Sequence, residues 1–198
     1  MSPCYKDAVA AYPTAPMPRV AVFHLDGTLL DSGYELSPRT AAALNAIADA
    51  GVLIVLATGR PVDAVLGQVD GHHAHFVVGS NGRELYSFET DHRQHDSLDI
   101  GAAGIDKLAG VKRLTDQLGV RRRDVIAFGD DLNDHGVLSW AGRGIAMGNA
   151  DPETIAVADE ITASNDEDGV AIVLEALLHA ASRAAAFRAP GGRRPRGS

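Results

Sequence analysis

Three almost continuous apolar runs, separated by helical patterns, most strongly constrain the fold of this chain. They are RVAVFH (19–24), VLIVLA (52–57) and VIAF (125–128), and none alternates polar with apolar residues. Strands of this kind are buried on both faces, as in a parallel sheet covered by helices. Helical patterns at 37–50 and 107–118 supply such covers. We therefore predict an α/β fold with a doubly wound, mostly parallel sheet.

One domain is expected between two tails. Residues 1–18 contain several prolines and little periodicity, and residues 182–198 are rich in Ala, Arg, Gly and Pro, so both ends are predicted to be disordered. The core domain then covers residues 19–181. Within it, residues 83–100 alternate polar and apolar side chains around a turn-like centre, which is typical of a small β-hairpin.

Charge and composition narrow the function classes. The formal net charge is −8, which argues against a general nucleic-acid binder because phosphate-backbone affinity comes mainly from clustered Lys and Arg. No run approaches the roughly 18 consecutive apolar residues of a membrane span, and the first residues lack a secretory signal pattern. We expect a cytoplasmic protein that binds neither nucleic acid nor membrane.

Polar side chains gather where the predicted strands end. They are His24, Asp26, Thr28, Thr58, Arg60, Asn81, Asp130, Asp131, Asn133 and Asp134. The carboxyl ends of parallel strands meet at one edge of a sheet, where ligands bind. Carboxylates, small hydroxyl groups and glycine-permitted backbone amides at one crevice are typical of a site for a hard cation such as Mg²⁺ that also holds phosphate.

Four motifs in order resemble the haloacid dehalogenase superfamily. HLDGTLLDS resembles its first motif, ATGR its second, Lys107 its third-motif lysine and GDDLND its fourth. Lys112 is the alternative third-motif lysine, and spacing to the fourth motif favours Lys107. The stretch AGRGIAMGNADPETIAVADEITASNDEDGVA is similar to the Cof-type branch, and the resemblance spans roughly residues 19–180. It implies phosphomonoester hydrolysis of a small phosphorylated metabolite with Mg²⁺ as cofactor.

The resemblance also implies roles for individual residues. The implied catalytic residues are His24, Asp26, Thr58 and Lys107. The implied substrate- and phosphate-binding residues are Thr28, Thr58, Gly59, Asn81 and Lys107. The implied metal site consists of His24, Asp26, Asp130 and Asp134, with Asp26 contributing its backbone carbonyl.

The chain departs from the family pattern at the cap domain. Cof-type proteins carry a large cap between the Asn-Gly after the third strand and the motif lysine, whereas only residues 83–106 lie there in this chain. The resemblance therefore implies a capless protein with a hairpin stump and an open pocket. We expect a homo-oligomer, a dimer or tetramer, to cover that pocket.

A second departure is His24, which stands where the family has its nucleophilic aspartate. A neutral imidazole is a poorer Mg²⁺ ligand than a carboxylate, and loss of a nucleophile costs many decades of rate. Histidine can also accept a phosphoryl group or act as an acid or base. Three interpretations stay open: a site that binds a phosphorylated ligand without hydrolysing it, an enzyme of non-standard mechanism or another reaction type, and an introduced substitution.

Overall fold

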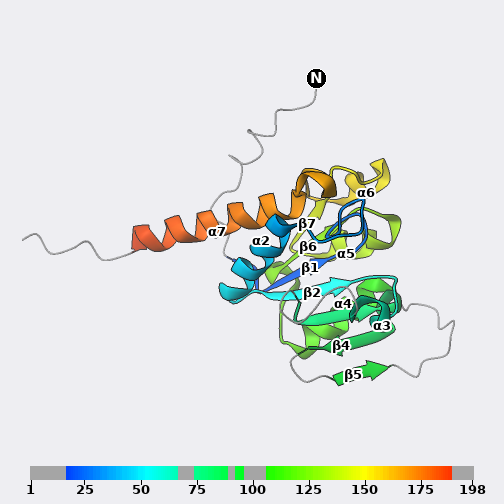
Figure 1. Cartoon of the computed structure of the whole chain (residues 1–198). Helices are drawn as coiled ribbons and strands as arrows, with labels where there is room; N and C mark the ends of the chain where they lie inside the picture. The colour runs from blue at the N-terminus through cyan, green and yellow to red at the C-terminus, as the bar shows by residue number, and fades with distance from the viewer. Residues whose placement is uncertain (1–16, 67–73, 89–91, 96–105, 189–198) are drawn as a thin grey trace, which may run out of the picture.

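One eight-stranded sheet organises the residues that the computed structural model describes, which are 17–66, 74–88, 92–95 and 106–188 (Figure 1). The strand order is β5-β4-β3-β2-β1-β6-β7-β8. The strands are β1 (Val20–Phe23), β2 (Leu53–Ala57), β3 (Phe76–Gly79), β4 (Glu84–Ser87), β5 (His92–His95), β6 (Val125–Gly129), β7 (Arg143–Ala146) and β8 (Glu160–Ile161). All neighbouring pairs from β3 to β8 are parallel, while β4 and β5 pair antiparallel at one edge. The predicted mostly parallel sheet is confirmed, and β4 and β5 pair as expected for the edge hairpin, whose turn (89–91) and last residues (96–100) lie outside the described residues.

Helices cover both faces of this sheet. The α-helices are α2 (Pro38–Asp49), α3 (Val62–Leu66), α4 (Lys107–Gln117), α5 (His135–Trp140), α6 (Pro152–Val157) and α7 (Gly169–Arg188). Four short 3-10 turns join them: η1 (Ser80–Gly82), η2 (Arg122–Asp124), η3 (Leu132–Asp134) and η4 (Asn165–Glu167). One core cluster packs α2, α3 and α7 against the sheet, and a second packs α4 and α5 against the other face. The fold is therefore doubly wound, as predicted.

The central strand shows why its sequence is apolar throughout. Ala21 and Phe23 face the α2 and α7 layer, whereas Val20 and Val22 face the α4 and α5 layer. Phe23 stacks on Phe128 of β6 with ring centroids 5.0 Å apart. Burial of each such large side chain contributes roughly 1.5–3 kcal/mol, so both faces of β1 stabilise the fold.

Two helix starts set the positions of side chains near the strand ends. Ser37 caps α2 by accepting a hydrogen bond from the backbone N of Thr40 at 3.0 Å. Asp106 caps α4 in the same way, through the backbone N of Ala109 at 2.8 Å. The cap on α4 makes Lys107 the first residue of that helix, directly beside the carboxyl edge of the sheet.

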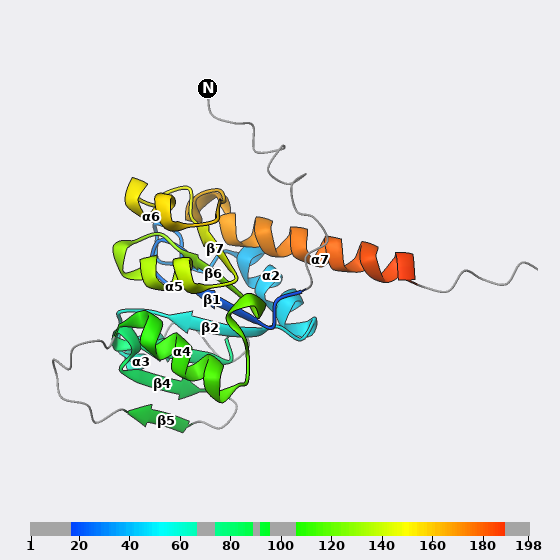
Figure 2. The same ribbon diagram turned by 180° about the vertical axis from the view of Figure 1, so that it is seen from behind.

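The C-terminal boundary of the predicted core domain needs correction. Helix α7 runs to Arg188, so residues 182–188 continue the helix instead of forming a tail. Its first half is buried, while its last turns extend away from the sheet in both views and expose Phe187 at 93% (Figures 1 and 2). Residues 182–188 are mostly alanine and arginine, which favour helix, and this explains why the helix continues beyond the core. At the other end Met17, predicted to lie in the N-terminal tail, packs against the core. Residues 1–16 and 189–198 lie outside the described part of the chain.

One helix in the described residues, α7, is long and apolar enough to cross a membrane by length and composition alone. This is weak evidence, because the core helix of a globular protein passes the same test. Val170, Val173 and Leu174 of this helix are buried in the core.

Candidate active site

A pocket of about 400 Å³ lies at the carboxyl ends of β1 and β6. It is lined by His24, Asp26, Gly27, Asp31, Ser32, Tyr34, Asp130, Asp131 and Asn165. The structure thus brings together the polar residues that follow the first strand and the VIAF strand. Because these loops are adjacent at the edge of the sheet, residues about a hundred positions apart in sequence share one wall.

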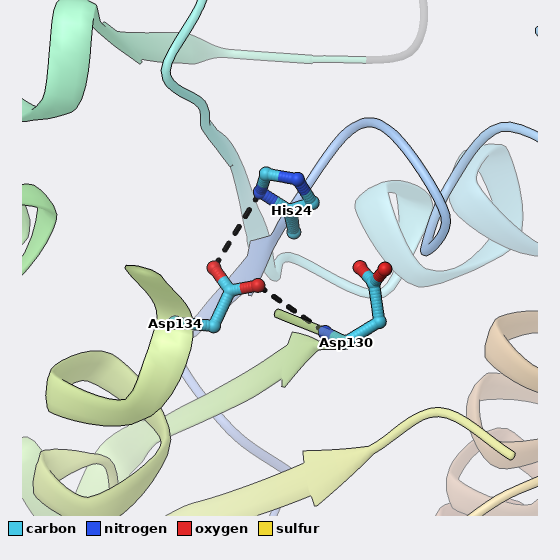
Figure 3. Close-up of side chains that lie close together, drawn as sticks. All are labelled: His24, Asp130 and Asp134. Carbon is cyan, nitrogen blue, oxygen red and sulfur yellow. Dashed lines mark hydrogen bonds and ion pairs between the residues drawn. The ribbon is translucent and has the colours of Figure 1, made fainter. Parts of the chain in front are cut away.

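A buried cluster of His24, Lys107 and Asp134 forms the inner end of the site. The Lys107 ammonium contacts His24 Nδ1 at 2.5 Å, Asp134 Oδ1 at 2.5 Å and Asn133 Oδ1 at 2.8 Å. His24 Nδ1 lies 3.5 Å from Asp134 Oδ1, and Figure 3 shows these two side chains facing each other. An ammonium group has three hydrogens to donate. All three are therefore directed at acceptors within the protein.

The contact with Lys107 bears on which imidazole nitrogen of His24 carries a hydrogen. When Lys107 is an ammonium it can only donate, and His24 Nδ1 is then the acceptor without a hydrogen. In the neutral imidazole the hydrogen then sits on Nε2, on the side of the ring away from Asp134 (Figure 3). His24 therefore offers the pocket an N–H donor instead of a nitrogen lone pair.

Two carboxylates stand next to the imidazole. Asp134 Oδ2 accepts hydrogen bonds from the backbone N of Asp130 and of Asp131, both at 3.2 Å. Asp130 Oδ1 accepts a hydrogen bond from the Thr28 hydroxyl at 2.6 Å. Ligand atoms of His24, Asp130 and Asp134 all lie within 4.8 Å of one another (Figure 3). The side chain of Asp26 is not part of this cluster.

Burial shifts the protonation of two groups in this cluster. It raises the pKa of Asp130, although the Thr28 hydrogen bond lowers it and the carboxylates of Asp134 and Asp131 raise it further. Burial also lowers the pKa of Lys107, which the adjacent Asp134 carboxylate opposes. A buried carboxylate beside other carboxylates is stabilised by a cation. A cation bound beside Asp130 and Asp134 would therefore stabilise the charged forms of these carboxylates.

Asp26 is held by an arginine outside the buried cluster. Arg60 binds both oxygens of the Asp26 carboxylate, with Arg60 Nε donating to Oδ2 at 2.8 Å. The guanidinium also lies over the ring of Tyr34, with Cζ 5.9 Å from the ring centroid. The bidentate contact fixes the orientation of Asp26 at the pocket wall. The structure therefore pairs Arg60 with a carboxylate of the site.

Several residues predicted to bind phosphate lie beside the pocket without lining it. These are Thr28, Thr58, Gly59, Asn81 and Lys107. Thr58 is fully buried, and its hydroxyl accepts a hydrogen bond from the backbone N of Arg60 at 3.1 Å. Asn81 has φ 51° and packs close to Gly59, and its buried Oδ1 has no hydrogen-bond partner among the described residues. The structure places these groups as supports of the site, and their role toward phosphate stays a prediction.

Sequence reasoning missed the outer wall of the pocket. Asp31, Ser32, Tyr34 and Asn165 line it, and none was singled out for a role. Asn165 lies in the SNDEDGVA stretch and donates from Nδ2 to the backbone O of Leu30 at 2.9 Å. The stretch was used only as a mark of the family, because nothing in its composition indicates which loop it contacts.

Asn149, also missed, links the loops around the pocket. Its Nδ2 donates to the backbone O of Gly27 at 2.8 Å, and its Oδ1 accepts from the backbone N of Asn165 at 2.9 Å. The first-motif loop is thereby tied to two loops that follow β7 and β8. The two hydrogen bonds of Asn149 consequently join the loops that form the pocket wall.

The curated relatives of the chain include several phosphatases. It is 40% identical over 96 residues to 5-amino-6-(5-phospho-D-ribitylamino)uracil phosphatase YitU of Bacillus subtilis, a match that covers 46% of this chain and 36% of that protein. It is 44% identical over 78 residues to a putative phosphatase of Haemophilus influenzae, covering 39% of this chain and 30% of the relative. The chain thus spans about a third of the length of these two relatives.

Solved structures agree with the fold. A haloacid dehalogenase-like hydrolase from Bacteroides thetaiotaomicron superposes with a TM-score of 0.70 at 23% identity, covering 80% of this chain and 98% of the other. One from B. subtilis gives 0.71 at 19% identity, covering 79% and 99%. At these identities the likeness concerns the fold alone.

The family assignment rests on the sequence pattern of the whole core. The pattern of haloacid dehalogenase-like hydrolases matches residues 21–92 and 84–174, which together include all four motifs and most of the sheet. The resemblance first indicated by those motifs is confirmed, and this chain belongs to the haloacid dehalogenase-like hydrolase family.

Proposed function

We propose that this chain is a phosphatase-type protein that binds a small phosphorylated metabolite at the pocket, and that hydrolysis is impaired at His24. The observation that carries the proposal is the 2.5 Å contact between the Lys107 ammonium and His24 Nδ1. With Lys107 as an ammonium, this contact occupies the Nδ1 lone pair, and the neutral ring then carries its hydrogen on Nε2. A nucleophile needs a free lone pair, so His24 is suited to donate a hydrogen bond to a phosphate oxygen and not to attack phosphorus.

The relatives support the phosphatase class. YitU acts, by its name, on a phosphorylated uracil derivative, and the Haemophilus protein is named a putative phosphatase. For this chain the proposed ligand class is a small phosphomonoester. The carboxylates at the pocket make a highly charged anionic ligand unfavourable unless a cation is bound with it.

Mg²⁺ is the proposed cofactor, and the donor set fits it in part. Asp130 and Asp134 would hold the ion together with the backbone carbonyl of Asp26, since hard cations prefer oxygen ligands. Oδ1 of Asp130 is taken by Thr28, but among the described residues no hydrogen-bond donor reaches its Oδ2. When bound, the ion would neutralise charge on the phosphate oxygens. His24 supplies no negative charge, so we expect weaker Mg²⁺ binding than with an aspartate there.

Two alternatives are kept as outcomes of the test. One is a protein that binds the phosphorylated ligand without turnover, and the other is an enzyme of another reaction type in the same pocket. A homo-oligomer that covers the pocket and a cytoplasmic location also stay predictions.

The experiment measures phosphate release from a panel of small phosphomonoesters by the unmodified chain and by His24→Asp, each with Mg²⁺ or with EDTA. We expect His24→Asp to release phosphate only with Mg²⁺, at least about 10³-fold faster than the unmodified chain, because it restores a nucleophile. The double variant His24→Asp/Asp130→Asn is the control. It should be inactive, which excludes a contaminating phosphatase.

Binding is measured separately from turnover. A phosphomonoester with Mg²⁺ should raise the unfolding temperature of the unmodified chain, because a ligand that binds only the folded state stabilises it. Comparable turnover by the unmodified chain would contradict impairment at His24. Absence of both turnover in His24→Asp and ligand-induced stabilisation would contradict the phosphatase class itself.

A further inference from the structure

The rim of the pocket carries an exposed aromatic side chain. Tyr34 is 63% exposed and lines the pocket. Five large hydrophobic side chains are exposed in the described part of the chain, and the other four, Leu132, Val157, Ile161 and Phe187, do not line it. Aromatic rings at the mouth of a pocket supply contact area for a ligand at a small cost in side-chain entropy. This combination of exposure and position makes Tyr34 a candidate ligand contact.

The backbone of Tyr34 adopts a conformation that a bulky residue rarely takes. Its φ is 62°, in the left-handed region that favours glycine and asparagine. The loop holds it there through several hydrogen bonds. The backbone N of Tyr34 donates to the backbone O of Asp31 at 2.9 Å, and Asp31 Oδ1 accepts from the backbone N of Gly33 at 2.8 Å and of Glu35 at 3.0 Å. Such over-determined conformations cluster at ligand-contacting loops.

The same loop is fixed to the rest of the pocket wall. The backbone N of Ser32 donates to Asp166 Oδ1 at 2.8 Å, and Asn165 Nδ2 donates to the backbone O of Leu30. The ring of Tyr34 therefore stands on a loop that is connected on both sides. A ligand that contacts it need not order the loop first, which lowers the entropy cost of binding.

Arg60 connects the ring to the inner end of the site. Its guanidinium lies over the Tyr34 ring with Cζ 5.9 Å from the centroid, while Nε donates to Asp26 Oδ2 at 2.8 Å. One planar group thus contacts both the aromatic rim and the carboxylate of the first motif. A phosphomonoester with its phosphate near His24 and Asp130 would extend its organic part past Asp26 toward Tyr34, since all four line the same pocket.

We propose that Tyr34 is a stacking platform for a planar ring in the organic part of the ligand. The substrate class is then a ring-bearing phosphomonoester instead of an open-chain or saturated one. The inference rests on the proposed function, because it assumes that the phosphate binds at the inner end of the same pocket. Aromatic rings favour offset-stacked or edge-to-face contact with another ring, and the guanidinium of Arg60 can stack on an aromatic face.

Three probes measure the contribution of a planar ring to binding separately from the contribution of the phosphate. Phenyl phosphate and cyclohexyl phosphate have the same number of ring carbons and the same phosphate group, but only the first is planar. Inorganic phosphate measures the affinity of the inner end of the pocket alone. Each is titrated by calorimetry into the full unmodified chain with Mg²⁺. We expect phenyl phosphate to bind about fivefold more tightly than cyclohexyl phosphate, the size of a typical aromatic pair contribution.

Variants then assign the preference to Tyr34. Tyr34→Asn removes the ring and suits the left-handed backbone, and it should bind both organic probes within about twofold of each other. Tyr34→Phe keeps the ring and should keep the fivefold preference. Phe187→Ala removes another exposed aromatic side chain far along α7 and should change nothing.

The outcomes distinguish this inference from the function on which it rests. If none of the three probes binds the unmodified chain, the proposed function is wrong and the inference is overturned with it. If inorganic phosphate binds but phenyl and cyclohexyl phosphate bind equally, only the stacking platform is overturned, and this comparison needs no variant to fold. A fivefold preference that survives in Tyr34→Asn would also overturn it.

Discussion

Replacing the buried lysine tests whether the cluster is assembled as described. Lys107 is 2% exposed, and its ammonium donates to His24, Asn133 and Asp134. Lys107→Met keeps an unbranched side chain of similar length and removes the charge. Asp134, also 2% exposed, would then be a buried carboxylate without its cationic partner.

The expected loss of stability follows from that uncompensated charge. Removal of one partner of a buried ion pair costs about 3–5 kcal/mol. Removal of the buried ammonium itself relieves its desolvation, so we expect a value near the lower end, about 3 kcal/mol. With a urea m-value of about 2 kcal/mol/M, the unfolding midpoint should fall by about 1.5 M.

Urea unfolding in EDTA measures this loss without a competing cation. Lys112→Met is the matched control, because Lys112 is exposed on the same helix α4 and should change stability by less than about 0.5 kcal/mol. The double variant Lys107→Met/Asp134→Asn should lose less than the sum of the single losses, since the two groups interact directly. A loss below about 1 kcal/mol in Lys107→Met, or additive losses in the double variant, would refute the buried pair.

Two further predictions concern the metal site and the helix pair α2–α7. Gly27 has φ 72° and an added Cβ would lie 2.2 Å from Asp130 Oδ2, so Gly27→Ala should weaken Mg²⁺ binding about tenfold by calorimetry. Gly51→Ala, at φ 87° with nothing within 4 Å, controls for backbone strain and should leave Mg²⁺ affinity unchanged. Arg39 lowers the pKa of Glu175 through two hydrogen bonds, so the pair stabilises the fold above the unfolded-state pKa of Glu and loses this effect as pH falls through the folded-state pKa. Because both side chains are nearly half exposed, Glu175→Gln should cost less than about 1 kcal/mol in urea unfolding at pH 7, and this cost should shrink as the pH falls through the lowered folded-state pKa of Glu175. A cost that does not change as the pH is lowered would contradict the ion pair.

The sequence predicted the fold well because its strands are long apolar runs with few alternatives. VAVF, LIVLA and VIAFG became β1, β2 and β6, and the helical pattern at 37–50 became α2. The end of α7 was predicted too early, because the residues after 181 combine strong helix formers with the Arg, Gly and Pro of a tail. The average composition of residues 182–198 therefore does not show where the helix ends.

The sequence predicted which residues lie at the inner end of the site, but not the contacts that they make with one another. The motifs indicated His24, Lys107 and Asp134. No sequence pattern, however, indicates that the Lys107 ammonium contacts His24, Asn133 and Asp134 together. That arrangement depends on how closely α4 approaches the sheet edge. Gly110 and Gly82 allow the approach, since a Cβ on Gly110 would lie 2.6 Å from the Cα of Gly82. Such packing distances are set by tertiary structure and cannot be read from spacing.

Within the described residues, the rim of the pocket comes from loops of the core itself. The wall is built by the loop that holds Tyr34 and by the loop of Asn165, joined through Asn149 to Gly27. Groups that would bind phosphate and groups that would select the organic part then belong to one hydrogen-bonded unit. If the phosphate binds at the inner end, the organic part of the ligand would therefore meet a preformed wall within the described residues.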